Sequence, residues 1–246
     1  MAQIAKEFIH AGHWLFRWRS LLPLLAISIF LIALRNFTYP AASHTLDIFW
    51  EMLCFAISFS GLGIRIHTVG HAPKGTSGRR TKNQRADVLN ITGMYSIVRH
   101  PLYLGNFLIW LGLVMFPRSF FFNLAAILLF FLYYERIIFV EEEFLREKFG
   151  QTFTEWADKT HIIFPRFKNL QNSALPFSLK TVLKREYTAF FLITTSFTCL
   201  EVLGDFFYEG KWQISWFYCL LFCFGLGVYI VLRSLKKMHF LDVEGR

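Results

Sequence analysis

Residues 101–140 read PLYLGNFLIWLGLVMFPRSFFFNLAAILLFFLYYERIIFV. Two apolar runs, 101–116 and 119–140, are separated only by Pro117 and Arg118, which interrupt the pattern and predict a tight turn. A helix that crosses a bilayer needs about 20 mostly apolar residues. It also satisfies its own backbone polar groups, as a lipid environment requires. The stretch therefore predicts a hairpin of two membrane helices, with the start of the first and the end of the second on one side.

The rest of the chain has the same apolar character. Hydrophobic residues make up 54% of it and charged residues 17%, whereas soluble domains have roughly 45–50% and 25%. We therefore exclude an ordinary soluble fold and expect an all-α polytopic membrane protein. The first apolar run is too long for a secretory signal and is interpreted as the first membrane helix. About six transmembrane helices are predicted, the hairpin being spans three and four and the other runs being 20–37, 46–66, 188–207 and 214–232.

The formal net charge of +9 is distributed unevenly. If six helices alternate in direction, all but three of the 26 Lys and Arg residues fall on one side of the membrane, the exceptions being Arg35, Arg118 and Lys211. Basic residues accumulate on the cytoplasmic side. We therefore expect both termini in the cytoplasm, in a bacterial inner membrane or the endoplasmic reticulum. The basic balance then reflects topology and attraction to anionic headgroups, and no nucleic-acid partner is expected.

Two polar segments interrupt the apolar runs on this side, 67–100 and 141–187. The second is expected to begin as a helix over 141–149 that Gly150 terminates, followed by a short helix over 153–159. The last two spans have a generic composition. We therefore divide the chain into a core, 1–168, and an accessory helix pair, 169–246.

Polar residues gather where the hairpin meets the cytoplasm. Pro101 suits the first position of a helix, which places Arg99 and His100 at the helix mouth beside free N–H donors that attract anions. The acidic run 141–143 ends the other arm of the hairpin. This run is expected to meet Arg99 and His100, with Glu142 and Glu143 as its solvated members. Such a mixture of charges suits a zwitterionic ligand, and we take Arg99, His100 and Glu141 as candidate catalytic residues.

The spacing of this motif carries a resemblance. It reads Gly-x-Tyr-x-x-x-Arg-His-Pro-x-Tyr-x-Gly over 93–105, followed by Glu-Glu-x-x-Leu-x-x-x-Phe-Gly over 141–150. The pattern resembles the isoprenylcysteine carboxyl methyltransferase family and the related phospholipid methyltransferases, over about 86–166. The resemblance implies an S-adenosylmethionine-dependent methyltransferase with a cytoplasmic cofactor pocket and a lipid or lipidated acceptor that arrives from the membrane.

The resemblance also implies roles for individual residues. A substrate arginine in the prenylcysteine enzymes lies four residues before the first glutamate. Here that position is Ile137, and Arg136 comes one residue earlier, so Arg136 and the nearby Glu135 are the candidate substrate residues. The implied cofactor residues are Leu89, Asn90, Tyr95, His100, Pro101, Leu102, Tyr103 and Glu141.

The acceptor stays open among a prenylcysteine carboxylate, a lipid phosphate and a phospholipid amine. Two other classes remain as alternatives. A small transporter would use the acidic residues within the predicted spans, and a non-catalytic membrane scaffold would use none of the motif. No metal is expected, because neither the cysteines nor the His67 and His71 pair provides enough ligands. The acidic residues of the transporter reading are Glu51, Glu201 and Asp205.

Overall fold

The computed structural model describes residues 7, 8, 11, 12, 14, 15, 17, 18, 30, 33, 34, 44–73, 76 and 86–246. The predicted first span, 20–37, lies almost wholly outside the described residues, as does most of the basic loop that precedes Ala86. Every regular element of the described part is a helix, and one isolated antiparallel bridge joins Gly93 to Gln171. The all-α prediction is therefore confirmed for this part of the chain.

Five of these helices are long. Four of them, α3, α6, α8 and α9, are long and apolar enough to cross a membrane, and α5 is a shorter apolar helix. These helices indicate an integral membrane protein, although the count of six spans remains a prediction. The bounds are α3 His44–Gly70, α5 Pro101–Met115, α6 Phe120–Phe149, α8 Leu179–Glu209 and α9 Trp216–Lys237, with short helices at α4 Met94–Ile97, α7 Gln151–Lys159 and a 3-10 turn Phe167–Asn169.

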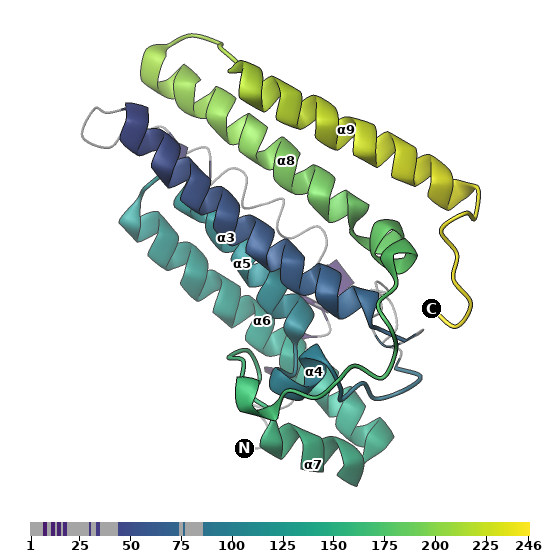
Figure 1. Ribbon diagram of the computed structural model, residues 1–246. Helices are drawn as coiled ribbons and strands as arrows, with labels where there is room; N and C mark the ends of the chain where they lie inside the picture. The colour runs from purple at the N-terminus through teal and green to yellow at the C-terminus, as the bar shows by residue number, and fades with distance from the viewer. Residues whose placement is uncertain are drawn as a thin grey trace.

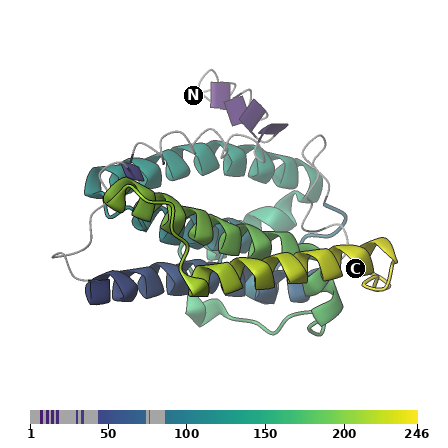
Figure 2. The ribbon, with the colours of Figure 1, turned by 90° about the horizontal axis from the view of Figure 1, so that it is seen from above.

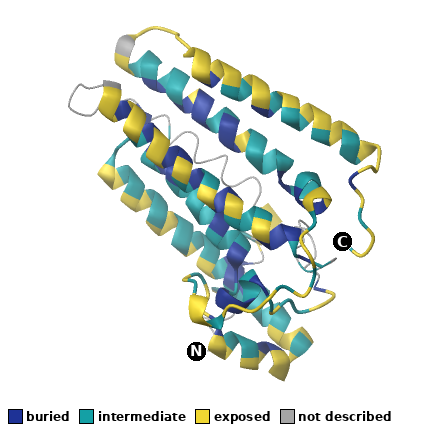
Figure 3. Cartoon of the chain, viewed as in Figure 1, coloured by how far each residue is buried: buried dark blue, intermediate teal, exposed yellow. Residues whose placement is uncertain are grey.

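The long helices form two groups, and neighbouring helices within each group run antiparallel (Figures 1 and 2). Helices α3, α5 and α6 lie side by side, and the hairpin of α8 and α9 packs against α3 through α8. Helices α4 and α7 lie at one end of the bundle, next to the start of α5 and the end of α6. Figure 3 shows buried residues along the inner sides of α3 and α8 and exposed residues along α9. The polar segments and the long helices thus meet at one end of the molecule.

Helices α3 and α5 approach each other through glycines. A Cβ atom at Gly105 would lie 2.5 Å from Cγ of Arg65 and 2.8 Å from the carbonyl oxygen of Gly61. Membrane helices associate by such small residues, since van der Waals contact and not the hydrophobic effect drives their packing. Gly105 belongs to the motif, so its role here is to let α3 and the Arg65 side chain come close.

The opposite end of the bundle is also tied by polar contacts. Arg118, in the turn between α5 and α6, forms an ion pair with Asp47 of α3. The Tyr218 hydroxyl of α9 donates to the buried Glu51 of α3 over 2.8 Å. Between these contacts and the motif lies an apolar core in which the rings of Phe55 and Phe197 stack at 4.1 Å. Glu51 therefore contributes to helix association.

Helix α6 is longer than a bilayer requires. Its 30 residues extend about 45 Å at about 1.5 Å per residue, whereas the hydrocarbon core is about 30 Å thick. Its last turns, which begin near Glu141, therefore project beyond the apolar region. Gly150 ends the helix with a positive φ of 53°, and its N–H binds the carbonyl of Arg146. The predicted helix end is confirmed.

Candidate active site

The motif begins in a loop that only glycine fits. Gly93 has φ of +60°, which L side chains rarely adopt, and a Cβ there would lie 2.4 Å from Oγ of Ser173. Ser96, three residues on, donates to the Gly93 carbonyl over 2.7 Å and accepts from the Gln171 N–H at 3.0 Å. The glycine of the motif therefore allows the second polar segment to lie directly on the first.

The second polar segment forms hydrogen bonds with the backbone that precedes α5. The N–H of Arg99 donates to the carbonyl of His161 over 2.8 Å, and the N–H of Arg166 donates to the carbonyl of Ile97 over 2.9 Å. Trp156 of α7 donates from its indole to the carbonyl of Tyr95 over 3.0 Å. Because these bonds fix the backbone on both sides of Arg99, its side chain leaves a rigid loop at the mouth of α5.

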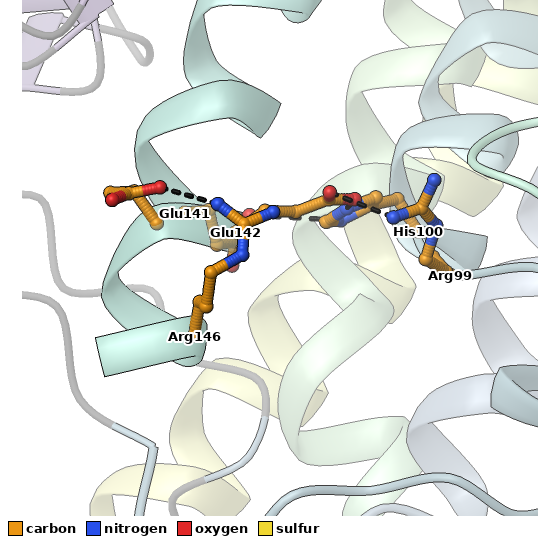
Figure 4. A network of polar contacts seen from close by, with 6 residues as sticks. Arg99, His100, Glu141, Glu142 and Arg146 are labelled. Atoms are coloured by element: carbon orange, nitrogen blue, oxygen red, sulfur yellow. Dashed lines mark hydrogen bonds and ion pairs between the residues drawn. The ribbon is translucent and has the colours of Figure 1, made fainter. Parts of the chain in front are cut away.

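Glu142 joins the two basic residues of the motif. One of its oxygens accepts from Nη1 of Arg99 over 2.8 Å, and the other lies 3.0 Å from Nε2 of His100. Figure 4 shows this carboxylate reaching from α6 to both side chains. The side chains of Arg99, His100 and Glu142 are 14%, 8% and 12% exposed. A largely buried charge cluster therefore joins the two arms of the hairpin, with His100 as the N-cap and Pro101 as the first residue of α5.

Glu141 occupies the neighbouring position of the same cluster. Its Oε2 accepts from the Tyr103 hydroxyl over 2.7 Å and lies 3.8 Å from Nδ1 of His100. The rings of His100 and Tyr103 stack at 5.4 Å. The Glu141 side chain is 32% exposed. It is therefore the carboxylate of the cluster that remains accessible to a ligand.

The acidic run thus divides differently from the prediction. The expectation that Glu142 is solvated is wrong, because Glu142 makes the buried pairs with Arg99 and His100. Glu143 is solvent-exposed as expected and pairs with Arg146 one turn further along α6. Successive residues of a helix point about 100° apart. The sequence therefore indicated that an acidic residue would meet the motif but did not identify which one.

Two of the predicted cofactor residues, Asn90 and Tyr95, line a small cavity beside α4. Burial of the Tyr95 phenol, reinforced by the negative charge of Glu141, raises the pKa of Tyr95 above its ordinary value. Leu89 is half-buried next to Asn90, and Leu102 is half-buried in the first turn of α5. The cavity is lined by His67, Thr68, His71, Asn90, Thr92, Met94, Tyr95 and Ser173.

A larger apolar cavity of about 290 Å³ lies between α5 and α6. Tyr134 is part of its wall, and the ring of Tyr134 lies 4.8 Å from that of Tyr103. The cavity is therefore connected to Glu141 through the side chains of Tyr134 and Tyr103. Its other lining residues are Phe30, Phe107, Trp110, Leu111, Val114, Phe122, Ala125, Ala126, Ile127, Leu129, Phe130 and Tyr133.

The two predicted substrate residues lie elsewhere on α6. The guanidinium of Arg136 sits over the ring of Phe8, 4.5 Å from its centroid, and Glu135 is exposed. Ile137, at the position of the arginine in the prenylcysteine enzymes, is fully buried. The structure therefore gathers Arg99, His100, Tyr103 and Glu141, and it places Arg136 against the N-terminal segment.

Comparison with known proteins identifies the same part of the chain. The family model for phospholipid methyltransferase matches residues 73–152. The cobalt-zinc-cadmium resistance protein CzcN of Cupriavidus metallidurans is 36% identical over 107 residues, which cover 43% of this chain and 47% of that protein. The nickel-cobalt-cadmium resistance protein NccN of Alcaligenes xylosoxydans xylosoxydans is 38% identical over 109 residues, with the same two coverages of 43% and 47%.

The chain thus spans about half the length of the curated relatives it matches. No solved structure matches it. The matched segment contains the Arg99 and His100 motif, both glutamates of the cluster and Gly150. The resemblance seen in the motif is confirmed for this part of the chain, because residues 73–152 match the phospholipid methyltransferase family.

Proposed function

We propose that this protein transfers a methyl group from S-adenosylmethionine to a membrane lipid or lipidated acceptor at the cytoplasmic face. The observation that carries the proposal is the position of the charge cluster of Arg99, His100, Glu141 and Glu142. It lies where α6 leaves the apolar region, and Tyr103 and Tyr134 connect it to the apolar cavity. The charge cluster and the apolar cavity therefore provide adjoining sites for a polar ligand and an apolar chain.

The donors and acceptors of the cluster fit the cofactor chemically. Within the part of the chain that the structure describes, Nε of Arg99 is buried without a hydrogen-bond partner, so one donor is left for a carboxylate. The partly exposed carboxylate of Glu141 suits ribose hydroxyls and a nearby sulfonium. The residues proposed to hold S-adenosylmethionine are those implied by the resemblance: Leu89, Asn90, Tyr95, His100, Pro101, Leu102, Tyr103 and Glu141.

When bound, the cofactor supplies an electrophilic methyl group to a nucleophilic oxygen or nitrogen of the acceptor. The residues of this chain then have three tasks. Glu142 holds Arg99 and His100 in place, which fixes the geometry that an in-line transfer requires. The apolar cavity between α5 and α6 excludes water from the acceptor. Glu141, with Tyr103 as its donor, accepts a proton if the acceptor has one to lose.

Among the acceptors, a phospholipid amine is supported best. Arg99 is already neutralised by Glu142, whereas Glu141 keeps a carboxylate facing the accessible side. A negative group favours a cationic headgroup over a phosphate or a carboxylate. An amine must also lose its proton before it attacks, and Glu141 is positioned to accept one. The family description of the matched segment agrees with this class.

The proposal also includes the orientation of the molecule. The polar segments, the cluster and the end of α9 share one end of the bundle, which is the end with most of the basic residues. We propose that this end is cytoplasmic. We also propose that residues 1–168 form a core and residues 169–246 an accessory helix pair. Arg136 and Glu135 are proposed to contact the acceptor at the membrane surface.

The test is binding of S-adenosylmethionine to the purified chain in detergent, measured by calorimetry. We expect dissociation constants in the micromolar range for wild type, and loss of binding for His100→Ala and Glu141→Ala. Glu143→Ala is the matched control, because Glu143 is an exposed neighbour on the same helix. A folded wild type that binds no cofactor overturns the proposal and favours the transporter or scaffold reading.

A second measurement identifies the acceptor. Tritium from the labelled methyl group is followed into vesicles of phosphatidylethanolamine, vesicles of phosphatidic acid, or a farnesylated cysteine. We expect the amine lipid to be labelled most, and Glu141→Gln to remove that labelling while the protein remains folded. Preferential labelling of the phosphate or the carboxylate would contradict the assignment of an amine acceptor.

A further inference from the structure

A second polar network lies deeper in the bundle than the motif. Arg65 of α3 donates through Nε and Nη2 to the two oxygens of Glu186 on α8, over 2.8 and 3.0 Å. Its Nη1 donates to Oδ1 of Asn106 on α5 over 2.5 Å. Asn106 in turn donates from Nδ2 to the Tyr134 hydroxyl of α6 over 3.0 Å. One chain of hydrogen bonds thus crosses four helices.

The two charges of this network are well shielded from solvent. The side chains of Arg65 and Glu186 are 16% and 5% exposed. An ionised group among membrane helices is unfavourable unless a partner compensates it, and a two-point contact between a guanidinium and a carboxylate also fixes the geometry. Gly105 provides the room for Arg65, since a Cβ there would overlap the arginine. The guanidinium is therefore held in one orientation.

The network ends at the proposed acceptor site. Tyr134 lines the apolar cavity, and its ring lies against that of Tyr103, whose hydroxyl donates to Glu141. The bond from Asn106 fixes one position of the Tyr134 hydroxyl at the head of the cavity. The Tyr134 ring forms the part of the cavity wall that contacts Tyr103, so its position shapes the cavity on the side of Glu141.

We propose that Arg65 and Glu186 are positioning residues, which act through Asn106 to hold Tyr134 at the head of the acceptor cavity. Helix α8 is then part of the active site, although both residues lie outside the segment matched by the family, 73–152. The inference rests on the proposed function for the identity of the cavity's ligand, a lipid acyl chain with an amine headgroup.

A purely structural role makes a different prediction. If the Arg65 and Glu186 pair only ties α3 to α8, its loss lowers stability and leaves ligand binding by the folded protein unchanged. Tyr134→Phe separates the two readings, because it removes the acceptor for Asn106 and leaves the ion pair intact. Arg65→Lys perturbs the network at its other end, since an ammonium keeps the charge but cannot replace the planar fork that binds both Glu186 and Asn106.

The experiment measures occupation of the cavity by a brominated phosphatidylethanolamine in detergent micelles. Trp110 lines the cavity, and bromine on the acyl chain quenches its fluorescence. The signal is the saturable quenching of wild type minus that of Trp110→Phe. We expect Glu186→Gln, Arg65→Lys and Tyr134→Phe each to raise the half-quenching concentration about five- to tenfold, as expected for the loss of one hydrogen bond.

The double variant Glu186→Gln with Tyr134→Phe decides the route. If Glu186 acts through Tyr134, the double variant is no worse than either single one, whereas independent effects multiply to about 25- to 100-fold. Lys184→Gln is the control on the same helix, because Lys184 pairs with Asp242 away from the network. Unchanged half-quenching in Tyr134→Phe, multiplying effects in the double variant, or an absence of saturable quenching in wild type each overturns the inference.

Calorimetry with S-adenosylmethionine on the same samples separates this inference from the proposed function. Cofactor binding is expected to stay within about twofold of wild type in all network variants, because none of the substituted residues is among those proposed to hold S-adenosylmethionine. If wild type binds no cofactor but shows saturable quenching, the proposed function is overturned and the cavity is a lipid-binding site only. Intact cofactor binding with unchanged quenching in the variants overturns the inference alone.

Discussion

Glu142 provides the sharpest test of the cluster, because its two neighbours in the acidic run are natural controls. Replacing Glu142 with alanine removes the acceptor for both Arg99 and His100. Each hydrogen bond to a charged group contributes about 1.5–3 kcal/mol. The side chains of Arg99 and Glu142 are 14% and 12% exposed, so water compensates part of the loss and the lower value applies to each bond. We expect the free energy of unfolding to fall by about 3 kcal/mol, at the low end of the 3–5 kcal/mol for broken buried pairs.

The assay is a titration with sodium dodecyl sulfate, followed by the helical signal, for wild type and two variants. Glu143→Ala is the matched control, since it removes the same side chain from the same turn of α6. Its pair with Arg146 is exposed, at 37% and 52% for the two side chains, and such pairs contribute less than about 1 kcal/mol. The difference in helix propensity between glutamate and alanine is the same for both variants and cancels in the comparison.

A double-mutant cycle completes the test. Arg99→Ala combined with Glu142→Ala should be less destabilised than the sum of the single variants, because the second substitution removes a charge that the first left unpaired. Equal effects of Glu142→Ala and Glu143→Ala, within about 0.5 kcal/mol, would refute the assignment of Glu142 as the residue that joins the two arms of the hairpin.

Three further predictions concern other contacts. Gly93→Ala adds a Cβ at φ of +60° against Ser173, and it should lower the free energy of unfolding by about 1–3 kcal/mol and weaken S-adenosylmethionine binding in calorimetry; an unchanged unfolding curve would contradict it. Because the pKa of Tyr95 is raised on folding, the native state keeps a proton that the unfolded chain loses, so stability should decline as pH rises above the ordinary value of 10.0. The midpoint temperature of thermal unfolding should therefore fall less steeply with rising alkaline pH for Tyr95→Phe than for wild type. Identical slopes for the two proteins would contradict this prediction. Tyr218→Phe removes the buried bond to Glu51 and should lower the free energy of unfolding by about 1–3 kcal/mol, with cofactor affinity unchanged in the same calorimetric assay.

The parts of the fold that the sequence predicted are those with local causes. Pro101 begins α5 and Gly150 ends α6 at the expected positions, because proline and glycine act on the backbone of their own turn. Helix α8 begins at Leu179, nine residues before the predicted apolar run at 188. Its first turns carry Lys180, Lys184 and Glu186, which hydropathy counts against a membrane helix although they are compatible with helix. Apolarity thus locates a span better than it locates the ends of its helix.

The identity of the acidic partner depends on a longer-range cause. Glu141 and Glu142 are equally suited by composition, and the spacing along the chain is nearly the same. The rotation of α6 about its own axis decides between them, and that rotation is set by packing against α5 over many residues, including contacts such as Phe107 with Phe130. Both carboxylates then serve, Glu142 as the fixed partner of Arg99 and Glu141 as the accessible one.

Arg65 shows how a charge count can conceal a buried pair. Counted with the basic residues of the following loop, it supported the expected topology, yet it lies five residues inside the end of α3 and bonds to Glu186, which is 121 residues away in sequence. A charge at that depth requires a partner, and among the helices that the structure describes, α5 and α8 pack on α3. Glu186 in the first turns of α8 provides this partner, and the pair links the accessory helices to the site more strongly than their generic composition suggests.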